Sequence, residues 1–179
     1  MIECGSTEEV GKKKALLLFS HDELLYDVAN IAYVEGHILP DVDPEIVHTL
    51  QDIAQEGNRD RVERILDKAH AILTELLYPF TKREITTDTL DNRLVERKVF
   101  GIGLELPDDF SQTTLNVMER LVHEYLVSDV IQDWLSITIT NTQRRDVWIE
   151  KREEARIKLK LCVNQRRGIS RSRLRPHWL

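Results

Sequence analysis

The chain has 179 residues, of which 41% are hydrophobic and 31% are charged. This composition is ordinary for a globular protein and excludes general disorder, and the length suits one domain with a sizeable core. The apolar run at residues 15–19 is far shorter than the roughly 20 residues that span a bilayer, so no membrane segment is expected. Cys4 and Cys162 lie near opposite ends and form no CxxC pair, which argues against a disulfide framework or a zinc site and favours a reducing compartment.

The net charge of −6 is divided unevenly along the chain. Glu154 is the last acidic residue, and the segment 156–179 has eight Lys and Arg residues, a formal charge of +8. Subtracting this from the total leaves −14 on residues 1–155. The sequence therefore predicts an acidic body with a basic C-terminal segment.

Hydrophobic spacing predicts a mainly α fold, a helical bundle of about five helices. Residues 1–14 show no periodicity and are expected to be a flexible leader. Residues 15–80 are expected to form the first part of the bundle. Within it, a capping box of Ser20 and Glu23 starts a helix that ends near Pro40.

Two more helices are predicted before residue 80. Asp43 and Pro44 suit the start of a short helix, which stops at Gly57. Asn58 is expected to cap the next helix, which has a long apolar stripe and ends at Pro79.

The hydrophobic period changes between residues 81 and 107. Threonines precede a turn signal at Asp91 and Asn92, and alternating apolar residues follow: Phe100, Ile102, Leu104 and Leu106. This pattern predicts a small β-hairpin insertion over residues 81–107. Residues 108–167 then complete the bundle with two long helices, and the helix starting at Ser111 is expected to be central because apolar residues cover over half its circumference.

Three short motifs suggest chemistry only weakly. His21 and Asp22 form the HD pair found in metal-dependent phosphohydrolases, but no second His/Asp motif accompanies it. His123 and Glu124 begin like HExxH, yet Val127 stands where the second histidine is needed.

The pair Gly101 and Gly103 lacks the third glycine of a phosphate-binding loop and is better explained as strand glycines. Trp134 and Trp148 lie on apolar helical stripes and are expected in the core. We therefore expect no catalytic residue, no metal site and no cofactor, and interpret the chain as a non-enzymatic protein. The remaining enzyme hypothesis, a metal held by His21 and Asp22, predicts a bound divalent ion.

Residues 168–179 form an extended basic arm with too little apolar area to order itself. It suits docking on a protein, binding of nucleic acid, or a merely solvated tail. We favour protein docking, because the acidic body would repel a duplex. The candidate partner-binding residues, which begin just before the arm, are Arg166, Arg167, Arg171, Arg173, Leu174, Arg175, Trp178 and Leu179.

The C-terminal part resembles the head–tail connector, or adaptor, proteins of tailed bacteriophages, above all those of phages and prophages of gut bacteria. The residues concerned are 121–127 (LVHEYLV), 133–138 (DWLSIT), Trp148 and the arginine-rich C-terminus, so the resemblance covers roughly residues 100–179. No match is recognised in the first hundred residues.

The resemblance implies a helical bundle with a β insertion and a C-terminal extension that reaches onto the portal ring. It also implies a structural subunit of a homo-oligomeric ring of about a dozen copies. Such a ring joins the portal protein to neighbouring tail or neck proteins, can contact packaged DNA, and lies in the virion after synthesis in the host cytoplasm. The alternative is a nucleic-acid-binding regulatory or packaging factor that uses the basic C-terminus.

Overall fold

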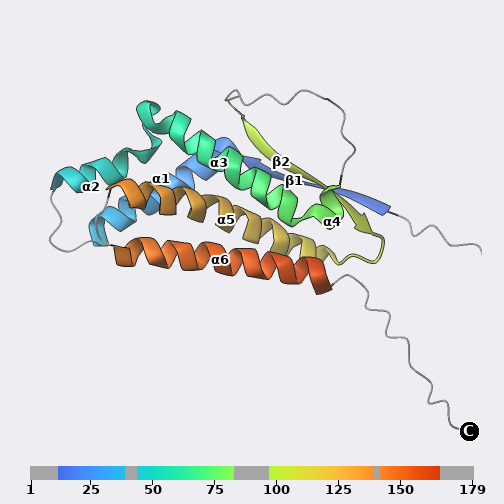
Figure 1. Ribbon diagram of the computed structural model, residues 1–179. Helices are drawn as coiled ribbons and strands as arrows, with labels where there is room; N and C mark the ends of the chain where they lie inside the picture. Colours follow the sequence, from blue (N-terminus) through green and yellow to red (C-terminus); the bar gives the residue numbers. More distant parts are fainter. Residues whose placement is uncertain (1–11, 39–43, 83–96, 139–141, 166–179) are drawn as a thin grey trace, which may run out of the picture.

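Residues 12–38, 44–82, 97–138 and 142–165 are described by a computed structural model and are mostly helical (Figure 1). The elements are, in chain order, β1 (Lys12–Ser20), α1 (His21–Ile38), α2 (Pro44–Gln51), the 3-10 turn η1 (Asp52–Ala54), α3 (Glu56–Leu76), α4 (Tyr78–Thr81), β2 (Val99–Pro107), α5 (Gln112–Thr138) and α6 (Thr142–Gln165). The predicted class, a helical bundle with a small antiparallel β element, is confirmed. The C-terminal arm lies outside the described residues.

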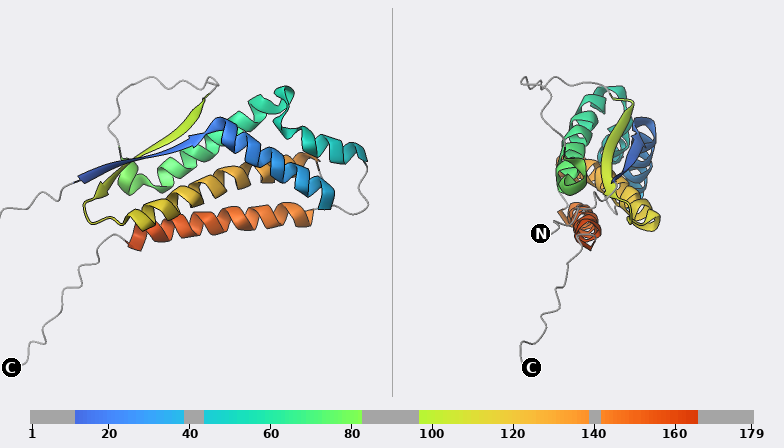
Figure 2. Two further views of the ribbon diagram at one scale, coloured as in Figure 1. Left: turned by 180° about the vertical axis from the view of Figure 1, so that it is seen from behind. Right: turned by 90° about the vertical axis from the view of Figure 1, so that its right-hand side faces the viewer.

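Helix α5 is the centre of the bundle. It contacts α1, α2, α3 and α6, and α6 runs antiparallel along its length (Figures 1 and 2). Its buried residues fall on most of the helix circumference, and twelve of its 27 residues are buried. A helix that is apolar nearly all round must be covered on several sides. The predicted central position is therefore confirmed.

The two strands pair antiparallel, with Lys12 opposite Pro107 and Ser20 opposite Val99. One face of this two-stranded sheet enters the core through Leu17 and Phe19 of β1 and the alternating apolar residues of β2. The segment 81–107, predicted as a β-hairpin insertion, contains one strand in its described part, β2, and the partner of that strand comes from the N-terminal part of the chain. The intervening residues 83–96 lie outside the described part.

This pairing corrects the expected N-terminal boundaries. Strand β1 consists of residues 12–14, which were assigned to a flexible leader, and residues 15–20, which were assigned to the bundle. Burial alternates along the strand, with Leu17 buried and Leu16 and Leu18 exposed. The run of leucines suits either a helix or a strand, and pairing with β2 decides between them.

The remaining helix boundaries agree with the sequence to within a few residues. Helix α1 begins directly after Ser20. Helix α3 begins at Glu56 with Gln55 as N-cap, so Gly57 lies in its first turn, and Asn58 instead donates a hydrogen bond to the carbonyl of Asp52 in η1 (2.9 Å). Pro79 lies in the first turn of the short α4, which begins at Tyr78, and α3 ends at Leu76; proline is well suited to a first helical turn.

The sheet is joined to the bundle by the ring of Phe100, which is fully buried between His21 and His70. We predict that Phe100→Ala lowers the free energy of unfolding by about 3–5 kcal/mol, because it removes a large core side chain and leaves a cavity. Urea unfolding followed by circular dichroism measures the change. The neighbouring Val99→Ala, on the exposed side of β2, is the control, and equal losses for both variants would contradict this packing.

Candidate interaction surfaces

The predicted partner-binding residues, Arg166 to Leu179, lie outside the described part of the chain. The structure does place their starting point. Helix α6 ends at Gln165, at the end of the bundle where α5 and β1 begin (Figures 1 and 2). The last described residue before the arm therefore lies at this end of the bundle.

Part of the positive charge in the basic segment is neutralised by acidic residues of α6. Arg156 forms an ion pair with Glu153 (2.9 Å), and Lys158 forms one with Glu154 (2.7 Å). Glu153 and Glu154 are the last two acidic residues of the chain, and each lies about one turn before its partner on α6, where the sequence spacing allows such pairs. Two of the eight cations counted in the composition of residues 156–179 are therefore paired within α6.

The weak chemical motifs have structural roles in the fold. His21 is buried, with its ring 6.3 Å from that of Phe100, whereas Asp22 is exposed. Gly101 and Gly103 lie on β2 opposite Leu18 and Leu16, as the strand interpretation predicts. Among the described residues, no three His, Cys, Asp or Glu side chains lie close enough together to hold a metal ion.

A histidine–carboxylate pair that the sequence did not reveal joins α5 to α1. Nε2 of His123 lies 3.1 Å from Oδ2 of Asp27, and both side chains are about one-third exposed. Their separation in sequence is too large for any spacing rule, so only the packing of α1 on α5 brings them together. The pair lies at the surface, in a groove.

The first turns of α6 are held by a buried carboxylate. The guanidinium of Arg144 donates to Oε2 of Glu35 at 2.6 and 2.8 Å, and the indole Nε1–H of Trp148 donates to Oε1 at 3.1 Å. Glu35 is 5% exposed, and two donors satisfy its charge. Trp148 is thus in the core, as predicted, and Trp134 is likewise buried and donates to the carbonyl of Leu50.

Farther along α6, a second polar network forms between α5 and α6. Arg152 donates to Asp129, Gln132 and Glu153. Burial, reinforced by the negative charge of Asp129, raises the pKa of the nearby Tyr125 phenol. Burial also acts to raise the pKa of the Glu153 carboxyl, but hydrogen bonds from the two neighbouring arginines outweigh it and lower that pKa. These groups join α5 to α6.

We predict that Arg144→Ala lowers the free energy of unfolding by about 2 kcal/mol, because the buried Glu35 loses its charged hydrogen-bond donor. Thermal or urea unfolding at neutral pH measures the effect. Lys12→Ala is the control, since Lys12 forms only a long, exposed pair with Glu105 and its loss should have little measurable effect. Equal free energies of unfolding for Arg144→Ala and Lys12→Ala would contradict the assignment of Arg144 as the main partner of Glu35.

Exposed apolar side chains are frequent on β1 and α1. Of thirteen large hydrophobic side chains that are exposed in the described residues, six belong to these two elements: Leu16, Leu18, Tyr26, Tyr33, Val34 and Ile38. We call this set the β1–α1 surface. Both elements lie nearest the viewer in the left view of Figure 2. Monomeric proteins seldom concentrate exposed apolar side chains in this way, so the β1–α1 surface is a candidate protein interface.

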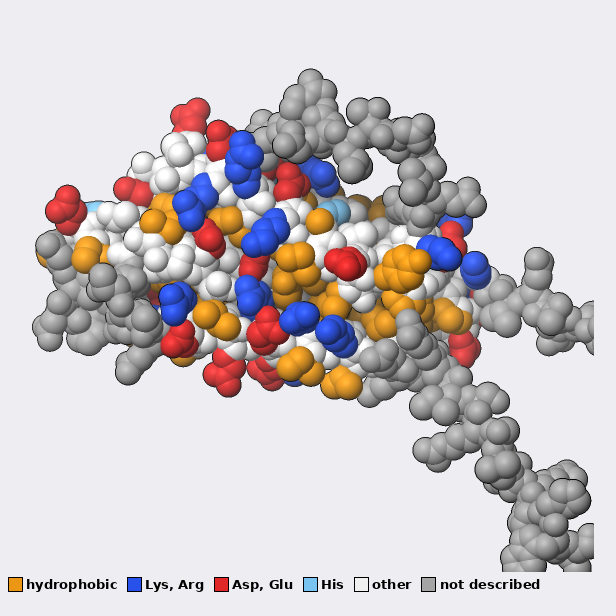
Figure 3. Space-filling view, viewed as in Figure 1, with side chains coloured by type: hydrophobic (Ala, Val, Ile, Leu, Met, Phe, Trp, Pro, Cys, Tyr) orange, Lys and Arg blue, Asp and Glu red, His pale blue; other side chains and the backbone are white. Residues whose placement is uncertain are grey.

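A second apolar surface lies where α6 ends. Val117, Ile157 and Leu161 are exposed there, beside a hollow of about 420 Å³ between α5 and α6. In the face shown in Figure 3, hydrophobic side chains are concentrated towards this end of the bundle, whereas charges of both signs cover the rest. This second surface borders the start of the arm.

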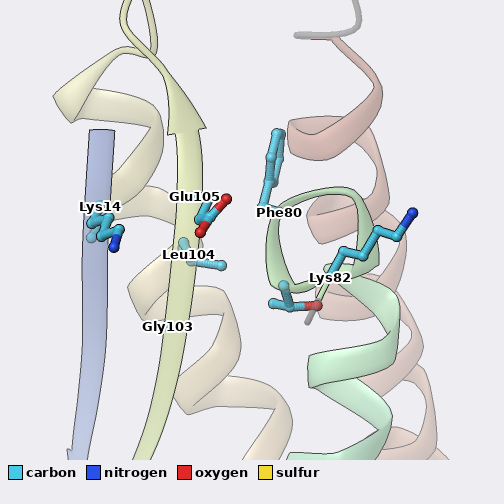
Figure 4. A pocket seen from close by; sticks show the side chains of 8 residues that line it. Lys14, Phe80, Lys82, Gly103, Leu104 and Glu105 are labelled. Carbon is cyan, nitrogen blue, oxygen red and sulfur yellow. The ribbon is translucent and has the colours of Figure 1, made fainter. Parts of the chain in front are cut away.

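A further hollow of about 280 Å³ separates the sheet from α4 (Figure 4). Phe80 and Leu104 form its apolar walls, and Lys14 and Glu105 stand on the strands at its side, while the side chain of Lys82 extends away from the strands. The lining has no nucleophile paired with a base. Its chemistry suits a contact with a side chain better than a reaction.

No protein-family model matches the sequence, and neither a curated protein nor a solved structure shows a significant match. No helix in the described part of the chain is both long and apolar enough to span a membrane.

Proposed function

We propose that this protein is a structural subunit of the head–tail connector of a tailed bacteriophage. In this proposal it is not an enzyme; it forms a homo-oligomeric ring of about a dozen copies beneath the portal. Its C-terminal arm docks on the portal protein, and its body contacts neighbouring tail or neck proteins in the virion.

The β1–α1 surface is the observation that best supports this proposal. Each subunit of a ring must bury surface against its neighbours, and protein interfaces are enriched in aromatic and apolar side chains. Tyr26 is 70% exposed and Leu16 is 61% exposed, so these side chains are available for such a contact. Aromatic and aliphatic side chains of this kind suit contact with a protein partner.

The charge distribution also supports an assembly role. All acidic residues lie in the body, and no acidic residue is near the five arginines after Gln165 in the sequence. Arginine and tryptophan are frequent in the energetic centres of protein interfaces. An arm with both residue types therefore suits docking on a protein with acidic or carbonyl-rich pockets.

The portal interaction can be tested by electron microscopy. We expect full-length protein to decorate candidate portal rings at moderate ionic strength, and a chain ending at Gln165 to leave them bare, because the truncated chain lacks the arm. The truncated chain keeps every core residue, the last of which is Val163, and is expected to fold.

Decoration by both chains would contradict a docking role for the arm. If neither chain binds the rings, the connector proposal fails. The alternative is then tested by DNA binding at several salt concentrations, since contacts with phosphates weaken steeply as salt increases.

The β1–α1 surface predicts a separate effect on self-association. We expect the double variant Leu18→Thr/Tyr33→Gln to form fewer oligomers than the parent chain, because it replaces exposed apolar side chains without opening the core. Analytical ultracentrifugation with portal present and absent measures this. Tyr78→Gln is the matched control, since Tyr78 is equally an exposed tyrosine (54%) but lies on α4. Unchanged assembly of the double variant would exclude this surface as the ring contact.

A further inference from the structure

A continuous groove runs between α1 and the α5–α6 pair. Two adjoining hollows, of about 360 and 270 Å³, share Asp27 and His123 in their linings. The first extends under β1 to Leu18 and Phe19, and the second extends along α6 to Trp148. The apolar hollow at the end of α6 adjoins the first, since Arg120 lines both. The groove therefore begins beside the point where the arm leaves the body.

The groove is more acidic than basic. Its lining contains four carboxylates, Glu23, Asp27, Glu119 and Glu124, and two cations, Arg120 and Lys151. Lys151 already lies over the ring of Trp148, 3.9 Å from its centroid, and Asp27 is paired with His123. Within the described residues, Glu23 and Glu119 are in no ion pair. Two surface carboxylates are thus available to a cationic ligand.

A buried hydroxyl in the groove also lacks a partner. Ser128 lines the second hollow and is 1% exposed, and its Oγ has no hydrogen-bond partner within the described residues. Leaving a buried hydroxyl unpaired costs about 1–3 kcal/mol, so such groups usually have a partner. A ligand that donates hydrogen bonds, as a guanidinium does, would satisfy Ser128 and the carboxylates together.

The arm has the length and the chemistry to reach this groove. From Lys151 to Gln165, α6 is about 21 Å long, and the fourteen residues after Gln165 can extend for about 45 Å. Gly168 allows the chain to reverse direction. The fourteen residues after Gln165, which include the arm, contain five arginines, no acidic residue, and apolar side chains at Leu174, Trp178 and Leu179. Because the arm is tethered, its effective concentration at the groove is about millimolar.

We propose that the groove between α1 and the α5–α6 pair is the docking site of the chain's own C-terminal arm. The arginines of the arm contact Glu23, Glu119 and the Asp27 region, and its apolar residues lie against the exposed hydrophobic side chains at the end of α6. This goes beyond the connector role. It gives the arm an intramolecular site, which a partner must displace before the arm can dock elsewhere.

Fluorescence anisotropy with a labelled peptide of residues 166–179 tests the proposal. The peptide should bind the chain ending at Gln165. It should bind the full-length chain at least about tenfold more weakly, because the tethered arm already occupies the groove. No binding to the truncated chain, or equal binding to both chains, would overturn the proposal; equal binding would mean that the groove is open in the intact protein.

Groove variants of the truncated chain identify the site. We expect Glu23→Gln/Glu119→Gln and, separately, Ser128→Ala to weaken peptide binding, the double variant by about tenfold. Glu56→Gln/Asp60→Asn removes two exposed carboxylates from the start of α3 and is the matched control, which should bind normally. A scrambled peptide of the same composition should bind more weakly than the native one.

If the groove and control variants lost the same peptide affinity, or if the scrambled peptide bound as tightly as the native one, the peptide would be attracted to the acidic body as a whole. Either result would overturn the groove as a defined site. These results are independent of portal decoration. The connector proposal can therefore fail while arm docking stands, and the reverse also holds.

Discussion

The burial of α5 is the constraint on which the rest of the structure depends. This helix is apolar on most of its circumference, and a helix of that kind is stable in water only when neighbours cover it. Helices α1 and α3 cover part of it, and α6 covers another side along its length. The cover therefore combines α6, which follows α5 in the sequence, with α1 and α3 from the first half of the chain.

Helix α6 is an unusual part of this cover, because charged groups help to hold it. Glu35 is buried and receives hydrogen bonds from both Arg144 and Trp148, while Arg152 joins α6 to Asp129. Buried ion pairs of this type are stable only in one geometry, since a shifted register would leave a charge unpaired. The polar contacts therefore fix the position of α6, and with it the point at which the arm leaves the body.

Two features of the described surface suit contacts with binding partners. The β1–α1 surface presents apolar and aromatic side chains, and the neighbouring groove presents carboxylates together with an unpaired hydroxyl. The first suits a protein partner and the second suits an arginine-rich segment. A connector subunit with a tethered basic arm would use both, one for its ring neighbours and one for control of the arm.

The sequence by itself determined the mainly helical class, the central position of α5, the presence of β structure between residues 81 and 107, and the division into acidic body and basic arm. Helical periodicity and charge are local properties, so they are readable without the fold. Only the tertiary structure decided that residues 12–20 form a strand, because Leu16 to Leu18 suit either conformation and the distant β2 selects one. The same holds for Asp27 with His123 and for the unpaired Ser128, since each depends on which helices pack together.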